Sequence, residues 1–154
     1  MMSDLHFKNQ AELHKHFSIH CFNKAWELID KTDRSEEETE EMVHYAMASL
    51  FHWSKREDCT ERHKSIGCRQ VSRCYALAGD LDQAERYGKL CLEFSENEEP
   101  FYLGYAHETL ARVHALNGNT KEKGKHLNIA RSLSETIKDK EEKELLLADL
   151  KTIK

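Results

Sequence analysis

Two eight-residue segments of this chain are near copies of each other. The segment RCYALAGD at 73–80 recurs as RVHALNGN at 112–119, which is an offset of 39 positions. Further residues keep their size under the same offset: Val71 pairs with Leu110, Ala76 with Ala115, Gly79 with Gly118, Cys91 with Ala130 and Phe94 with Leu133. A repeat of this length predicts stacked helical hairpins, because each hairpin buries its apolar face only against the next one.

Helical patterns continue on both sides of the repeat. The chain has one proline and six glycines, so it can form few tight turns, and long helices are favoured. Residues 8–31 carry apolar side chains at helical spacing, and Ser35 with Glu38 has the spacing of a capping box that opens a second helix. We expect Asp58 to cap a third helix, with Ala78 at the end of its buried face. The strongly amphipathic segment KDKEEKELLLADLKTIK predicts a last helix.

The repeated segment resembles the tetratricopeptide repeat. In that family a large residue near the end of the first helix precedes a Gly-Asp turn, and small residues follow in the second helix. Tyr75, the pair Gly79-Asp80, Ala84 and Cys91 fit this scheme. The second copy departs from the scheme with His114, Asn119 and Lys123 at the corresponding positions, and the offset of 39 exceeds the usual period of about 34.

The resemblance implies an all-α fold of one domain, a right-handed α-solenoid of about three hairpins. We expect a divergent first hairpin at 8–55, repeats at 59–97 and 100–137, and a capping helix at 139–153, all within a single domain 1–154. The chain is also similar to a group of bacterial proteins of this layout, which carry comparable HW and SRxYAL segments and have no assigned activity.

Tetratricopeptide arrays line a concave groove with the first helix of each hairpin, and the resemblance places four residues there. These are Arg69, Arg73, Glu108 and Arg112, in which Arg73 and Arg112 are equivalent. Two such guanidinium groups can bind a carboxylate or phosphate through paired hydrogen bonds. The alternative is that Arg73, Arg112 and Glu108 only form ion pairs between the helices. A groove of this kind indicates binding of a protein or peptide partner. The alternative binding function is self-association of the chain.

His52 and Trp53 are two further candidates for ligand contact. They end the second expected helix, which we predict to lie beside the entrance of the groove. An imidazole and an indole can stack on a ligand and donate hydrogen bonds to it. The alternative is a half-buried tryptophan that closes the core.

Ten histidines raise the question of a metal. His16 and His20 stand four residues apart, so both lie on one face of a helix, as a metal site requires. The alternative function is therefore a metal-binding helical bundle enzyme similar to the DinB type. The chain has no HExxH motif, cysteine cluster, nucleophile motif or nucleotide-binding glycine loop, so we predict neither a metal nor another cofactor, and binding rather than catalysis.

The net charge and the cysteines indicate which class of partner and which cellular compartment to expect. The net charge of −5, with both signs interspersed, argues against a nucleic acid partner. The five cysteines form no CxxC pair, and Cys21, Cys74 and Cys91 occupy apolar helical positions, so we expect free thiols. The first residues, MMSDLHFKNQ, lack the apolar run of a signal peptide, and no segment is long enough to span a bilayer. We expect a cytoplasmic protein that does not bind membranes.

Overall fold

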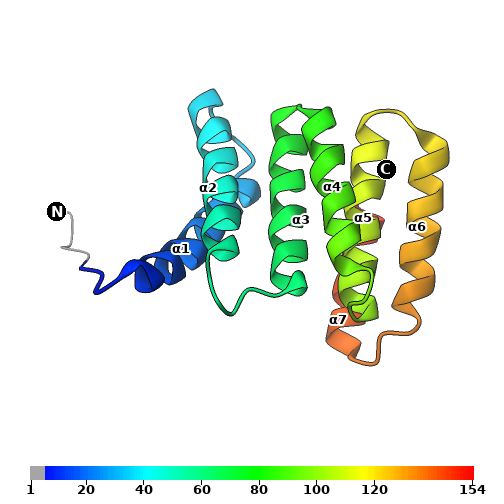
Figure 1. The fold of residues 1–154 in the computed structure, drawn as a ribbon. Coiled ribbons are helices and arrows are strands. Elements are labelled where there is room, and N and C mark those ends of the chain that lie inside the picture. The colour runs from blue at the N-terminus through cyan, green and yellow to red at the C-terminus, as the bar shows by residue number, and fades with distance from the viewer. Residues whose placement is uncertain (1–5) are drawn as a thin grey trace.

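The computed structural model describes residues 6–154, which form seven α-helices and no strand (Figure 1). This confirms the all-helical prediction. The helices are α1 (Gln10–Asp30), α2 (Glu36–Ser54), α3 (Glu61–Ala78), α4 (Leu81–Ser95), α5 (Pro100–Leu116), α6 (Thr120–Ser134) and α7 (Lys140–Lys151).

The helices pack in two layers. The most extensive contacts join α1 with α2, α3 with α4, and α5 with α6, so consecutive helices form three hairpins. The odd-numbered helices also contact one another in the order α1, α3, α5 and α7, whereas α2, α4 and α6 have no Cα atoms within 8 Å of one another among the described residues. Figure 1 shows the hairpins side by side, with α7 behind α5. One layer is therefore continuous and built from odd-numbered helices.

The start of α3 differs from the prediction. Its N-cap is Thr60, whose hydroxyl accepts from the backbone N–H of His63, while the His63 ring accepts from the backbone N–H of Thr60. Asp58 lies two residues earlier and binds Arg56, with 2.6 Å between carboxylate oxygen and guanidinium nitrogen. A guanidinium partner thus occupies the carboxylate that we expected to cap the helix. The capping box of Ser35 and Glu38 at α2 is confirmed.

Both copies of the repeat turn in the same way. Gly79 and Gly118 have positive φ angles of 84° and 77°, which place them in the left-handed region that disfavours side chains. The next residue then caps the following helix: the Asp80 side chain accepts from the Gln83 N–H, and that of Asn119 accepts from the Glu122 N–H. The two turns explain why these short segments are so similar.

Two glycine substitutions are expected to have opposite effects. Gly79→Ala should lower the free energy of unfolding by about 1–2 kcal/mol, because alanine is strained in the left-handed region. Gly124→Ala should raise it by about 0.5–1 kcal/mol, because Gly124 is inside α6 and an added Cβ would meet nothing within 4 Å. Urea unfolding followed by circular dichroism measures both. A stabilising Gly79→Ala would contradict the assigned turn.

The core consists of three apolar clusters between adjacent helices. One apolar cluster joins α1, α2 and α3, a second joins α3, α4 and α5, and a third joins α5, α6 and α7. In the third cluster, Leu146 and Leu150 of α7 are fully buried, as the amphipathic pattern predicts. Ala78, which we expected to be buried, is exposed because it is the last residue of α3.

The cysteines and the helix lengths answer two further expectations. All five cysteines are free thiols, and the three predicted at apolar positions, Cys21, Cys74 and Cys91, are buried. Burial raises the pKa of the Cys74 thiol to about 12, so that thiol stays protonated at neutral pH. Among residues 6–154, none of the helices combines the length and the apolar character needed to cross a bilayer.

Candidate ligand-binding pocket

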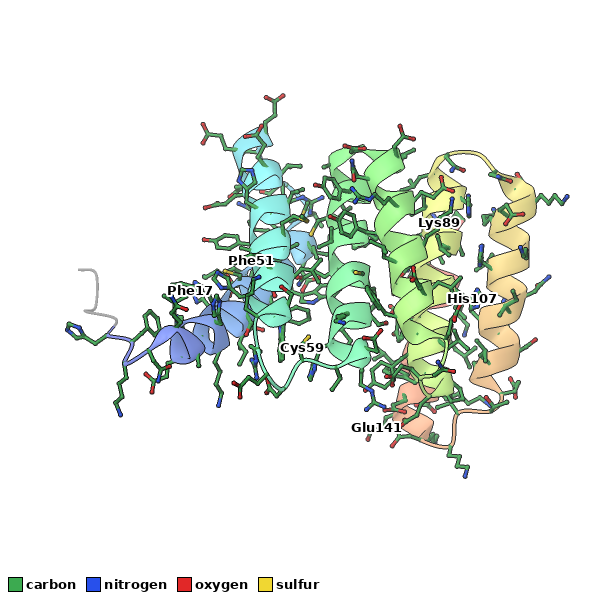
Figure 2. All side chains as sticks on the ribbon, in the orientation of Figure 1. Phe17, Phe51, Cys59, Lys89, His107 and Glu141 are labelled. Carbon is green, nitrogen blue, oxygen red and sulfur yellow. The ribbon has the colours of Figure 1, made fainter. Side chains whose placement is uncertain are left out.

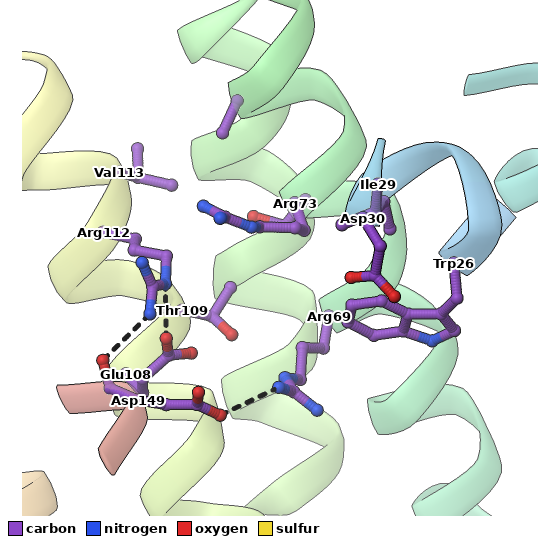
Figure 3. A pocket seen from close by; sticks show the side chains of 12 residues that line it. Trp26, Ile29, Asp30, Arg69, Arg73, Glu108, Thr109, Arg112, Val113 and Asp149 are labelled. Atoms are coloured by element: carbon purple, nitrogen blue, oxygen red, sulfur yellow. Dashed lines mark hydrogen bonds and ion pairs between the residues drawn. The ribbon is translucent and has the colours of Figure 1, made fainter. Parts of the chain in front are cut away.

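A cavity of about 340 Å³ opens on the layer of odd-numbered helices (Figure 3). All four of these helices contribute to its wall, and α3 and α5 contribute most. The four groove residues that the tetratricopeptide resemblance implies all line it, namely Arg69, Arg73, Glu108 and Arg112. The structure therefore brings together side chains that the sequence places up to 43 positions apart (69 to 112).

Arg112 is fixed by internal partners. Its Nε donates to the carboxylate of Glu108 one turn earlier on α5, and that side chain is only 4% exposed. A terminal nitrogen of Arg112 also donates to the backbone carbonyl of Asp149 at 3.0 Å and to the hydroxyl of Thr152 at 2.7 Å. Arg112 thus neutralises a buried acid and holds the C-terminal end of α7 against α5.

Arg69 is held mainly by aromatic rings. Its guanidinium carbon lies 3.9 Å from the ring centre of Tyr105 and 5.6 Å from that of Trp26, which are distances of cation–π contact. The Asp149 carboxylate lies 4.0 Å from Arg69 and accepts a hydrogen bond of 2.6 Å from the Tyr105 hydroxyl. Arg69 therefore has a weak ion pair and a stacked position, both inside the pocket.

Arg73 is half-buried and lacks such partners. No carboxylate of residues 6–154 lies within 4.0 Å of its guanidinium, and it forms no hydrogen bond with them (Figure 3). Burial lowers the pKa of Arg73, and the positive charge of Arg112 lowers it further. The predicted ion-pair network of Arg73, Arg112 and Glu108 is therefore only partly formed, since the described ion pair joins Arg112 to Glu108 alone.

The pocket also contains residues that the repeat did not predict. Trp26, Ile29 and Asp30 come from the end of α1, and Asp149 comes from α7. Asp30 is exposed and has no ion-pair partner among residues 6–154. The pocket thus holds three guanidinium groups and three carboxylates, and after internal pairing it presents Arg73 on one wall and Asp30 on another.

His52 and Trp53 do not line this pocket. The ring of His52 lies 2.9 Å from that of His14 between their Nδ1 atoms, on the α1–α2 hairpin. Trp53 stacks on His63, with ring centres 4.3 Å apart, and lines a separate apolar cavity of about 230 Å³. Neither residue contributes to the wall of the pocket, because the end of α2 faces α1 and the start of α3.

His16 and His20 lie on α1, as expected from their spacing. Their rings stack with centres 5.5 Å apart, but neither belongs to a group of three metal-binding side chains within residues 6–154. Such a group does occur elsewhere, where His114, Glu122 and His126 meet between α5 and α6.

Comparison with known proteins gives no matching family model, no similar curated protein and no similar solved structure. The pocket itself therefore has to indicate the function.

Proposed function

We propose that this chain is a small binding module, a tetratricopeptide-like right-handed α-solenoid whose pocket holds an acidic group of a peptide or protein partner. The repeat, its two glycine turns and the continuous layer of odd-numbered helices support the proposed architecture. The pocket opens on the layer of odd-numbered helices, which corresponds to the layer that lines the groove in tetratricopeptide arrays.

The observation that carries the function is the state of Arg73. Charged side chains that are taken out of water are normally paired, because desolvation of an unpaired charge costs free energy. Arg73 is held partly buried, faces the positive Arg112, and has no acidic partner among residues 6–154. A carboxylate from a ligand would supply the missing charge and accept two hydrogen bonds from the planar guanidinium.

The rest of the pocket restricts what such a ligand can be. Asp30 and Trp26 stand on the α1 wall, and together they favour a positive or aromatic group at that end. A peptide with an acidic residue a few positions from a basic one has both features. The cavity of about 340 Å³ has room for one or two side chains, so the remaining contacts would lie along the groove.

Arg73→Ala is expected to remove binding while leaving the fold intact. The probe is a random peptide library displayed on phage and selected on the immobilised wild-type chain, which should enrich acidic peptides. Arg73→Ala should weaken the selected peptides by about 30-fold or more, as measured by fluorescence anisotropy, because a desolvated charge pair is lost. Thermal melting should stay nearly unchanged, since Arg73 makes no hydrogen bond within the described chain.

Arg131→Ala is the matched control, because Arg131 is exposed on α6, away from the pocket. It removes the same charge and should leave the peptide affinity unchanged. Equal affinities of wild type and Arg73→Ala for every selected peptide would show that the pocket is not the binding site. Equal weakening by Arg131→Ala would reduce the effect to net charge.

A further inference from the structure

Four metal-binding side chains face one another inside the α5–α6 hairpin. His107 and His114 are two turns apart on α5, and Glu122 and His126 are one turn apart on α6, so each pair lies on one helix face. Figure 2 labels His107, which lies between these two helices. The three imidazoles are 6–9% exposed, whereas the Glu122 side chain is 33% exposed. Glu122 is therefore the side open to solvent.

Three of these residues bring their donor atoms to one point. One ligand atom from each of His114, Glu122 and His126 lies within 4.8 Å of the other two, and His126 Nε2 is 3.8 Å from Glu122 Oε2. Ligand atoms around a tetrahedral zinc ion stand about 3.4 Å apart, given bonds of about 2.0–2.1 Å. Small side-chain rotations would therefore close the cluster around an ion.

His107 orients the His126 ring. The two Nδ1 atoms are 2.8 Å apart, so one ring donates a hydrogen bond to the other. When His126 is the donor, its Nε2 carries a free lone pair on the side of Glu122. Metal-bound histidines characteristically donate their second ring N–H in this way, which fixes the ring and its tautomer.

The surroundings of the cluster are mixed in charge. Lys125 lies 3.6 Å from the Glu122 carboxylate, so an incoming cation would displace an exposed ammonium group from that oxygen. The Asn117 amide lies 3.4 Å from His114 Nδ1 at the turn between the helices. His107 and His114 lie on a different face of α5 from Glu108 and Arg112, and the cluster shares no residue with the wall of the proposed ligand pocket.

We propose that this cluster binds one divalent transition-metal ion, with His114, His126 and Glu122 as ligands and His107 as the positioning residue. Imidazole nitrogens favour zinc, cobalt, nickel or copper over magnesium or calcium. Two histidines and one carboxylate leave a coordination position open for water. Since the ligands come from both helices of one hairpin, the ion fastens α5 to α6 and stabilises the folded chain.

The test uses the full chain after treatment with EDTA and dialysis, with Zn²⁺ and Co²⁺ as probes. Calorimetric titration with Zn²⁺ should give one ion per chain, and Co²⁺ should give visible ligand-field bands. The melting temperature should rise with the metal concentration. His126→Gln and Glu122→Gln should each weaken binding by more than about 100-fold, and His107→Gln by about 10–100-fold with a shifted cobalt spectrum at unchanged stoichiometry.

The double variant His16→Gln/His20→Gln is the matched control, because it removes the other histidine pair and should leave binding unchanged. Glu122→Gln keeps the shape of a partly exposed side chain, so it decides the matter even if His126→Gln does not fold. Absence of stoichiometric uptake by the folded wild-type chain at millimolar Zn²⁺ would overturn the proposal. Retention of the metal by Glu122→Gln together with its loss in the control variant would move the site to α1.

Discussion

Arg112→Ala is expected to lower the free energy of unfolding by about 3 kcal/mol. The substitution leaves the Glu108 carboxylate buried without its guanidinium partner, and Glu108 is only 3% exposed. It also removes two hydrogen bonds that join α5 to the end of α7. Urea unfolding followed by circular dichroism measures the change. The loss should be much greater than for Arg73→Ala, although the two arginines are equivalent in the repeat.

A second background separates the charge pair from simple truncation. In the Glu108→Gln background, Arg112→Ala leaves no buried carboxylate without a partner, so this substitution should cost only about 1 kcal/mol, as for the loss of neutral contacts. The difference between the two backgrounds is the coupling of Arg112 with Glu108. An identical cost in both backgrounds would show that the ion pair contributes nothing to stability.

Leu146→Ala is expected to destabilise the chain by about 3 kcal/mol. Leu146 is fully buried, and one of its methyl carbons lies 2.6 Å from where a Cβ on Gly104 would stand, so α7 packs closely on α5. Truncation leaves a cavity between helices that the rigid α5 backbone cannot fill. The same unfolding experiment measures the loss, and thermal melting should fall with it.

The neighbouring leucine provides the control. Leu145 is 53% exposed, so Leu145→Ala should change the free energy of unfolding by less than about 0.5 kcal/mol. If both leucine variants were as stable as the wild type, α7 would not be docked as described. Equal destabilisation by both would show that Leu145 is packed as closely as Leu146, contrary to its exposed position in the structure.

The sequence predicts the helices well where local chemistry decides them. Gly79 and Gly118 end helices through their left-handed backbone, and Ser35 with Glu38 caps α2 as its spacing indicates. The prediction that Asp58 caps α3 is wrong because its carboxylate pairs with Arg56 instead. Which of the two contacts forms depends on how the loop folds. The prediction that Ala78 is buried is wrong because periodicity does not show that the last residue of α3 is exposed.

The pocket is predicted only as far as the repeat extends. The resemblance to the tetratricopeptide repeat implies a groove position for Arg69, Arg73, Glu108 and Arg112, and the structure brings all four to one cavity. The α1 and α7 walls could not be predicted, since neither helix belongs to the matched segments. Trp26, for example, has no counterpart under the offset of 39 from which its position could be inferred.

The metal-binding cluster was missed for a different reason. Spacing within a single helix selects His16 and His20, and it does not show which side chains of two different helices meet. In an antiparallel hairpin, residues equally distant from the turn lie side by side. His114 and Glu122 stand four positions before and four after Gly118, so this symmetry about a predicted turn is a signal that could have found them.

The position of α7 couples the pocket to the integrity of the C-terminal helix. Asp149 supplies part of the wall, and Arg112 spends one nitrogen on the backbone of that same helix. A ligand that leaves this hydrogen bond intact would bind the form in which α7 is docked on α5. Its binding would therefore reduce the fraying of α7. A ligand that takes the Arg112 guanidinium as its own hydrogen-bond donor would instead weaken the docking of α7. If the proposed ligand binds here, its affinity and the local unfolding of α7 would therefore be thermodynamically coupled.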